Sequence, residues 1–180
     1  MARFFILFVV ILAALFAAEL TAPVQSAVVV PWTRALVRIS AGLITFFDPH
    51  VAVSGNILQS TTNSFAISVR AGCNGVEAAL ILIAAMLAFP AAWKYRVIGI
   101  LAGLTAVQLL NIVRVLSLFY LGQWSMKAFD WAHFYLWPAL IMLDVLIVWM
   151  IWIRTLPGAS TAVAPPAPAV DGGAPQAIAP

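Results

Sequence analysis

Three side chains in this sequence have the types that nucleophilic chemistry requires: the thiol of Cys73, the guanidinium of Arg114 and the imidazole of His133. A thiolate can attack a carbonyl carbon, and an imidazole near its pKa can accept the thiol proton. A guanidinium can stabilise the negative charge that develops on the oxygen. The chain has a single cysteine, so Cys73 is either a small buried apolar residue or a functional thiol.

The spacing places these three residues at one level. Each lies at one end of an apolar run whose other end carries a basic residue. The runs are about 18–21 residues long, and at about 1.5 Å of rise per residue they climb roughly 27–32 Å, close to the thickness of the hydrocarbon layer of a bilayer. The basic residues at the far ends are Lys94, Arg96 and Arg154. We therefore expect the basic residues to mark one face of a membrane and the three reactive groups to meet at the other.

The composition excludes a soluble protein. Hydrophobic residues make up 64% of the chain, charged residues make up 8%, and the mean hydropathy is +1.07. Soluble domains carry about a quarter charged residues. The nine Lys and Arg residues are scattered, with no basic run, so nucleic acid is a poor candidate partner. The sequence predicts an integral membrane protein in contact with lipid.

No metal or other cofactor is expected. One cysteine excludes both an intramolecular disulfide and an all-cysteine metal site. The two histidines, His50 and His133, lie far apart, and the aspartates nearest to them in sequence, Asp48 and Asp130, complete no ligand spacing.

The apolar runs predict an all-α bundle of four transmembrane helices, at residues 4–20, 76–93, 97–121 and 134–153, within a single membrane domain at 1–156. The first run could instead be a cleaved signal peptide, but the lone Arg3 before it and Glu19 near its end favour an uncleaved signal anchor. With Arg3 inside the cell, the loop at 21–72 would face outward. Residues 157–180 are rich in Pro and Ala and predict a disordered tail.

The outer loop contains the polar part of the chain. Residues 28–47 are apolar, but Arg34 and Arg38 fall one helical turn apart, and each would cost about 2.5–3.5 kcal/mol near the centre of a membrane. We therefore expect an amphipathic helix lying in the interface; a fifth span there would move the catalytic face to the cytoplasm. Farther along, Phe65, Ile67 and Val69 alternate with small polar residues, which predicts a short β-hairpin.

Each reactive residue also has an ordinary structural interpretation. Cys73 lies between two glycines at the start of a helix, where the helix dipole favours a thiolate and a substrate backbone can come close, but it could be inert. Arg114 could reach lipid headgroups; against this, it continues a polar stripe formed with Gln108 and Asn111, which belongs against protein. His133 could be an interfacial residue among aromatic side chains.

Two carboxylates within the apolar runs leave alternatives open. Glu77 follows Cys73 by one helical turn and could pair with Arg114 or orient His133, although its charge would oppose a thiolate. Structural pairing is the simpler interpretation. Asp144 near mid-membrane could form a hydrogen bond with Gln108 or the backbone, be protonated, or take part in proton transfer.

Taken together, these motifs resemble one family. Gly72-Cys73-Asn74-Gly75 opens a helix, Asn111-Ile112-Val113-Arg114 comes late in the next, and His133 begins the last. This order resembles the exosortase/archaeosortase family of membrane-embedded cysteine transpeptidase-proteases, and the stretch from Cys73 through Asn74 and Glu77 is most similar to exosortase H. The resemblance covers about residues 65–154. It implies Cys73 as nucleophile with Arg114 and His133 as its partners, and Asn74, Glu77 and Asn111 in support.

The resemblance implies an enzyme that cleaves the C-terminal sorting signal of exported proteins. Such a signal has a short motif, a transmembrane helix and a basic tail. The enzyme would be a multi-pass protein of the bacterial inner membrane whose active site faces the outer side. The alternative from the residues alone is a non-enzymatic scaffold or a small transporter subunit, with Arg114, Glu77 and Asp144 joining helices.

Overall fold

The computed structural model describes residues 2–157 and is built mainly of helices. The predicted disordered tail falls almost wholly on residues 158–180, outside the described part of the chain. In chain order, the helices are α1 (Ala2–Glu19), α2 (Ala22–Val24), the π-helical turn η1 (Gln25–Val29), α3 (Val30–Thr45), α4 (Val76–Ala88), α5 (Trp93–Trp124), α6 (Met126–Trp131), the π-helical turn η2 (Ala132–Leu136) and α7 (Trp137–Arg154). A small sheet lies between α3 and α4 in the sequence.

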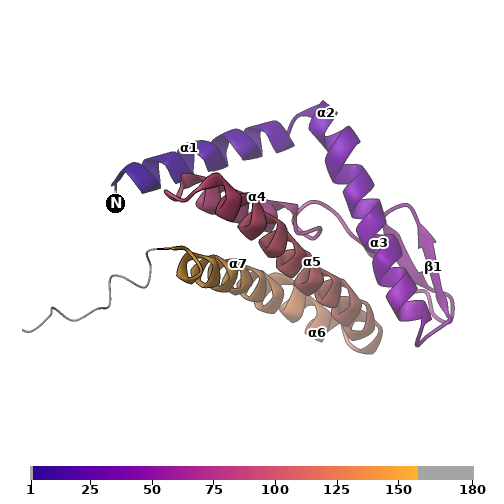
Figure 1. Ribbon diagram of the computed structural model, residues 1–180. Coiled ribbons are helices and arrows are strands. Elements are labelled where there is room, and N and C mark those ends of the chain that lie inside the picture. Colours follow the sequence, from indigo (N-terminus) through magenta and orange to yellow (C-terminus); the bar gives the residue numbers. More distant parts are fainter. Residues whose placement is uncertain (1, 158–180) are drawn as a thin grey trace, which may run out of the picture.

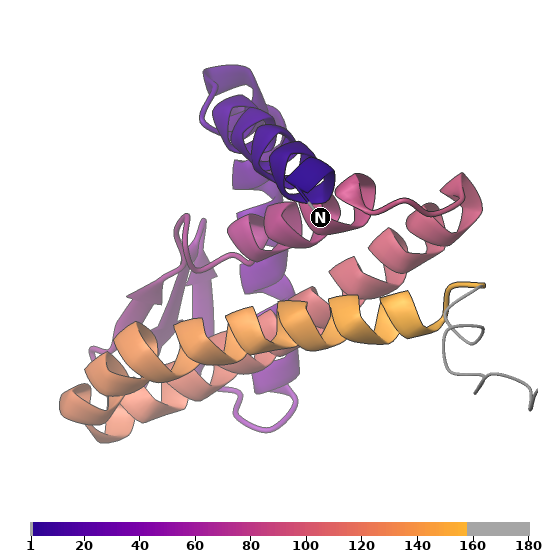
Figure 2. The same cartoon turned by 90° about the vertical axis from the view of Figure 1, so that its left-hand side faces the viewer.

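Helix α4 is packed between α1 on one side and the long helices α5 and α7 on the other (Figures 1 and 2). A core of apolar side chains joins α4, α5 and α7, including Leu82, Val107 and Val145. All of these helices are rich in Leu, Ile, Val and Ala, so the sequence contains enough apolar surface to face both the core and lipid.

The predicted basic end of the bundle is present. The ring of Phe4, next to Arg3, lies 6.1 Å from that of Phe89 and 6.0 Å from that of Trp149. The start of α1 therefore lies beside the end of α4 and the last turns of α7. The basic residues at this end are Arg3, Lys94, Arg96 and Arg154.

The second predicted span is shorter than expected. Helix α4 ends at Ala88, and Phe89 is already extended (φ −76°, ψ 136°). The cause is Pro90, which disfavours the helical conformation of the residue before it. Lys94 and Arg96 thus belong to the first turn of α5, not to the end of the preceding span. With 13 residues, α4 climbs about 20 Å, less than a full hydrocarbon layer.

Within residues 2–157, four helices are long and apolar enough to cross a membrane, as expected in number, but they are not the same four: Ala2–Glu19, Ala22–Thr45, Trp93–Trp124 and Met126–Arg154. The segment Ala22–Thr45 is thus long enough to span a membrane, whereas α4, which was expected to do so, is too short. Its interfacial position stays a prediction.

Helix α3 remains near the far end of α5 instead of returning to the basic end. Leu36 and Ile44 of α3 share a core with Val115 and Phe119, in the second half of α5. Arg34 and Arg38 are exposed on the opposite side of α3. Figure 1 shows α3 passing beside the end of α5, away from the start of the chain. A helix that crossed back through the membrane would end near Lys94, so this packing favours the interfacial position.

The sheet has one strand more than the predicted hairpin. Strands β1 (Val51–Ser54), β2 (Ile57–Ser60) and β3 (Ala66–Ser68) pair antiparallel in the order β1-β2-β3. The alternation of Phe65, Ile67 and Val69 was interpreted correctly: these side chains face the core shared with α3 and α5. The prediction of a single strand pair was one strand short: the turn at Gly55 folds β1 onto β2, and β2 then pairs with β3.

The contact between sheet and helix leads to a test of stability. A Cβ at Gly122 of α5 would overlap the ring of Phe65. We expect Gly122→Ala to destabilise the fold by about 1–3 kcal/mol, because a packed ring must move. The control is Gly42→Ala in α3, where a Cβ meets nothing within 4 Å and a helix former replaces glycine. Thermal unfolding in detergent should show a lower Tm for the first variant only; equal Tm values would contradict the described packing.

Candidate active site

The three reactive residues predicted from the sequence converge. The Cys73 sulfur lies 3.4 Å from Arg114 Nη2 and 4.0 Å from His133 Nε2. They come from three separate parts of the chain: the loop before α4, the second half of α5 and the π-helical turn η2. Charged and polar groups thus surround one half-buried thiol on two sides.

The loop that carries Cys73 depends on two glycines with positive φ. The backbone N–H of Cys73 donates to the carbonyl of Arg70 (2.9 Å), which closes a turn. Gly72 has φ +82° and Gly75 has φ +74°, a conformation that favours glycine. The space around Gly72 is open, whereas a Cβ at Gly75 would come within 3.2 Å of Asn111. The loop is therefore open to its surroundings at Gly72 and closely packed against α5 at Gly75.

The polar stripe of α5 lies beneath this loop, as its sequence pattern predicted. Gln108 Nε2 donates to the carbonyl of Gly75 (3.3 Å), and Asn111 is fully buried against the same glycine. Both polar atoms of the Asn111 side chain are without a hydrogen-bond partner. The stripe faces protein and not lipid.

Helix α3 holds the other side of the loop. The fully buried Asn74 donates from Nδ2 to Thr33 Oγ1 (3.0 Å) and accepts from the backbone N–H of Val76 (3.1 Å). The backbone carbonyl of Asn74 accepts from the indole N–H of Trp32 (3.3 Å). Asn74 therefore joins the nucleophile loop, α3 and the start of α4. Sequence reasoning missed Trp32 and Thr33, because neither occurs in a recognisable motif.

Arg114 is almost completely buried and points at the loop. Its Nη1 donates to the Gly72 carbonyl (3.3 Å) and its Nη2 to the Cys73 sulfur. A guanidinium in an apolar bundle is costly unless it finds acceptors. The alternative of an Arg reaching lipid headgroups is thereby excluded.

The His133 ring is fixed by packing. It stacks on the ring of Phe129, one turn earlier, with centroids 5.5 Å apart and an interplanar angle of 5°. His133 Nδ1 is buried without a partner, so no carboxylate of the described residues orients it through that atom. The Phe129 ring therefore limits the orientation of the imidazole.

Glu77 does not pair with Arg114, contrary to the structural pairing that the sequence favoured. One oxygen of its carboxylate accepts the backbone N–H of Gly72, which closes the loop onto α4. The alternative role, to orient His133, is also not seen.

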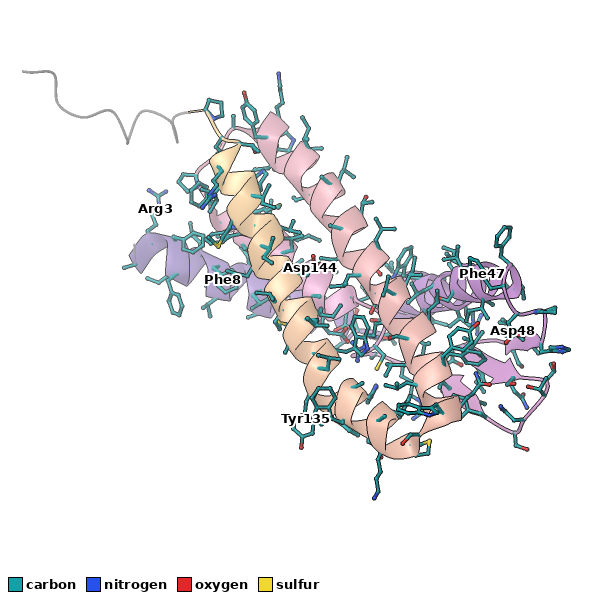
Figure 3. The ribbon with its side chains drawn as sticks, turned by 90° about the horizontal axis from the view of Figure 1, so that it is seen from below. Arg3, Phe8, Phe47, Asp48, Tyr135 and Asp144 are labelled. Atoms are coloured by element: carbon teal, nitrogen blue, oxygen red, sulfur yellow. The ribbon has the colours of Figure 1, made fainter. Side chains whose placement is uncertain are left out.

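Asp144 lies halfway along α7 (Figure 3). Its Oδ2 atom is buried without a hydrogen-bond partner. Gln108, the side chain expected to bond with Asp144, donates to the Gly75 carbonyl instead.

Three influences set the pKa of Cys73. Burial raises the pKa of the thiol most strongly, the charge of Arg114 lowers it, and the charge of Glu77 raises it again; the net direction is upward. The resting sulfur at neutral pH is therefore a protonated thiol. A nucleophilic role consequently needs a base within reach, and His133 Nε2 is the nearby atom that can act as one.

A cavity of about 40 Å³ opens beside the sulfur. Its walls include Cys73, Arg114, His133 and Phe129, and on the other side the strand residues Ile67, Ser68 and Val69. This volume holds a few water molecules at most. The cavity is too small to hold a peptide segment.

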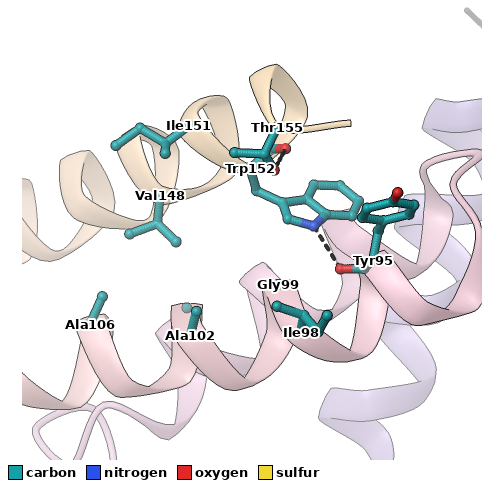
Figure 4. A pocket seen from close by; sticks show the side chains of 10 residues that line it. Tyr95, Ile98, Gly99, Ala102, Ala106, Val148, Ile151, Trp152 and Thr155 are labelled. Carbon is teal, nitrogen blue, oxygen red and sulfur yellow. Dashed lines mark hydrogen bonds between the residues drawn. The ribbon is translucent and has the colours of Figure 1, made fainter. Parts of the chain in front are cut away.

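A larger cavity, of about 350 Å³, lies at the basic end between α5 and α7. Figure 4 shows Trp152 closing it, with the indole N–H donating to the carbonyl of Tyr95 (2.9 Å). Its lining contains no thiol, imidazole or carboxylate. The smaller cavity, which is lined by Cys73, Arg114 and His133, is therefore the better candidate for a catalytic site. Within residues 2–157, no group of three or more His, Cys, Asp and Glu side chains forms a metal site.

The comparisons with known proteins give one match. A family model described as "Transmembrane exosortase (Exosortase_EpsH)" matches residues 1–152. This range includes the three parts of the chain that form the site: the loop before α4, the second half of α5 and the π-helical turn η2. No curated protein and no solved structure was found to match the chain.

Opposite charges around the thiol lead to a paired prediction. Arg114→Gln removes the charge that lowers the pKa of Cys73, so alkylation by iodoacetamide at pH 8 should become several-fold slower. Glu77→Gln removes a charge that raises this pKa while keeping an acceptor for Gly72, so alkylation should become faster. The rate should be measured against pH on detergent-solubilised protein. Shifts of the same sign in both variants would contradict the electrostatic account.

Proposed function

The chain is a multi-pass membrane protein that belongs to the transmembrane exosortase family, and on this premise we propose that it is a cysteine peptidase or transpeptidase acting on membrane-anchored proteins. The observation that carries the proposal is the contact of one thiol with both a guanidinium and an imidazole, at 3.4 Å and 4.0 Å. The substrates would be exported proteins with a C-terminal motif, a transmembrane helix and a basic tail.

The chemistry follows from the positions of the three groups. His133 Nε2 accepts the thiol proton as the Cys73 sulfur attacks the carbonyl carbon of the scissile peptide. Negative charge moves to the carbonyl oxygen, and Arg114 beside the sulfur stabilises it, a contribution of roughly 3–4 kcal/mol in other acyl-transfer enzymes. The C–N bond then breaks, and the imidazolium returns its proton to the leaving amine.

The product of this step is a thioester between Cys73 and the N-terminal part of the substrate. Water or an amine then attacks the thioester carbonyl, loses its proton to His133 and releases the sulfur. Water makes the enzyme a protease, and an amine makes it a transpeptidase. Catalytic hydrogen bonds are often long before substrate binds, so the 4.0 Å separation of sulfur and imidazole fits a resting state.

We place the active site on the outer side of the bacterial inner membrane. Arg3, Lys94 and Arg154 lie at the end of the bundle away from Cys73, and basic residues in short loops favour the cytoplasm. The position of α3 beside the second half of α5 supports a single crossing between Arg3 and the catalytic loop.

The nucleophile is tested with a co-expressed substrate. The probe is a tagged protein of the same genome that ends in a short motif, an apolar helix and a basic tail. Cys73→Ser should abolish its processing, and Arg114→Lys should reduce processing by at least tenfold, because an ammonium lacks the two separate nitrogens with which the planar guanidinium reaches the sulfur and the Gly72 carbonyl. Undiminished processing by a correctly inserted Cys73→Ser variant would rule out Cys73 as the nucleophile.

A non-enzymatic scaffold is separated from the enzyme by labelling. As Cys73 is the only cysteine of the chain, a membrane-impermeant maleimide added to intact spheroplasts reports on this residue alone. We expect labelling from outside, slowed by Arg114→Gln. A scaffold needs no reactive thiol and predicts no labelling. Labelling only after the cells are opened would contradict the proposed orientation.

A further inference from the structure

Strand β3 has an unpaired edge next to the active site. In the order β1-β2-β3, β3 lies at the edge, and within residues 2–157 no further strand pairs with it. Figure 2 shows the sheet beside the end of the bundle where α5 passes into α6. An unpaired edge exposes backbone donors and acceptors, which can bind another extended chain.

The hydrogen bonds to β2 show which backbone groups are free. The N–H of Val69 donates to Asn56 (2.9 Å), and the N–H of Ser60 donates to Phe65 (3.0 Å). In an antiparallel ladder the pairing alternates, so 65, 67 and 69 point their backbone groups at β2. Ala66 and Ser68, between them, direct their N–H and C=O groups outward. Both residues are exposed.

This edge leads directly to the nucleophile. Ser68 and its neighbours form one wall of the cavity that contains the Cys73 sulfur and the His133 ring. After Ser68 the chain makes the turn closed by the Cys73 N–H and the Arg70 carbonyl. An extended peptide along β3 would thus pass the mouth of a cavity too small to admit it.

We propose that the extended segment of the substrate around the scissile bond binds as a fourth strand on the edge of β3, paired with the backbone of Ala66 and Ser68. The inference rests on the proposed function. Pairing of this kind satisfies the backbone of both chains near a membrane, where unpaired N–H and C=O groups are costly. It would position the scissile carbonyl by main-chain hydrogen bonds, so substrate side chains need to match only at a few positions.

A proline scan of the two sheet edges tests the proposal. Ser68→Pro removes an outward N–H but none that pairs with β2, and we expect substrate processing to fall by about tenfold or more. Ser68→Ala keeps the N–H and loses only the hydroxyl, which accepts from Asn56 Nδ2 (3.1 Å); it should reduce processing far less than Ser68→Pro does. Val53→Pro is the matched control, because Val53 is exposed and its N–H points outward from β1, the opposite edge.

The iodoacetamide rate of Cys73 and the Tm should be measured for all three variants. Wild-type processing by Ser68→Pro would overturn the proposal, as would an equal loss in Val53→Pro. If Ser68→Pro lowers the Tm strongly, a loss of processing no longer separates lost strand pairing from unfolding. A second measurement, which leaves the strand intact, then tests the proposal.

The second measurement is disulfide cross-linking in a chain that cannot turn over. Cys73→Ser leaves the protein without cysteine, so Ser68→Cys in that background provides a single thiol. The tagged substrate carries one cysteine at successive positions across its processed segment. We expect oxidation to cross-link Ser68→Cys with every second substrate position, because side chains alternate along a paired strand. Absence of cross-links, or a helical period, would overturn the proposal.

The two failures are distinguishable. If Cys73→Ser still processes the substrate, the proposed function fails whatever the cross-links show. If Cys73→Ser is inactive but no alternating pattern forms, only the strand-addition proposal fails.

Discussion

The buried guanidinium of Arg114 is the constraint on which the site depends. In an apolar bundle a charged side chain must find acceptors, and those of Arg114 are the Gly72 carbonyl and the Cys73 sulfur. The loop before α4 therefore cannot move away from α5 without exposing a charge to a medium that solvates it poorly. Stability and chemistry are coupled at this point: the group that holds the loop in place is the group that stabilises negative charge on its sulfur. The second anchor is Asn74, which joins the same loop to α3.

The thiol is kept between two opposing effects. Burial and Glu77 raise its pKa, and Arg114 lowers it. A thiol that stays protonated at rest resists oxidation and becomes a nucleophile only when a base removes its proton. The cavity beside the sulfur has room for a few water molecules, and residues of β3 and η2 form part of its wall.

Much of this arrangement was predictable from the sequence, because helix rise and membrane thickness are fixed lengths. The spacing of Arg114 and His133 from the basic residues placed both at the level of Cys73, and the stripe through Gln108 and Asn111 identified the inward face of α5. The short α4 was not predicted: the effect of Pro90 was outweighed by an apolar run that looks continuous. The contact of Thr33 with Asn74 joins residues distant in the sequence, and no local pattern specifies such a pair. Glu77 was paired with the wrong partner, because the nearest opposite charge is a weaker guide than a backbone N–H one turn away.

The most direct measurement of the central claim is detection of the thioester on Cys73. With the tagged substrate present, mass spectrometry of the acid-quenched protein should show the N-terminal part of the substrate attached to Cys73, and neutral hydroxylamine should release it. Cleaved substrate formed at the wild-type rate with no adduct on Cys73, in samples quenched throughout the first turnover, would contradict the account.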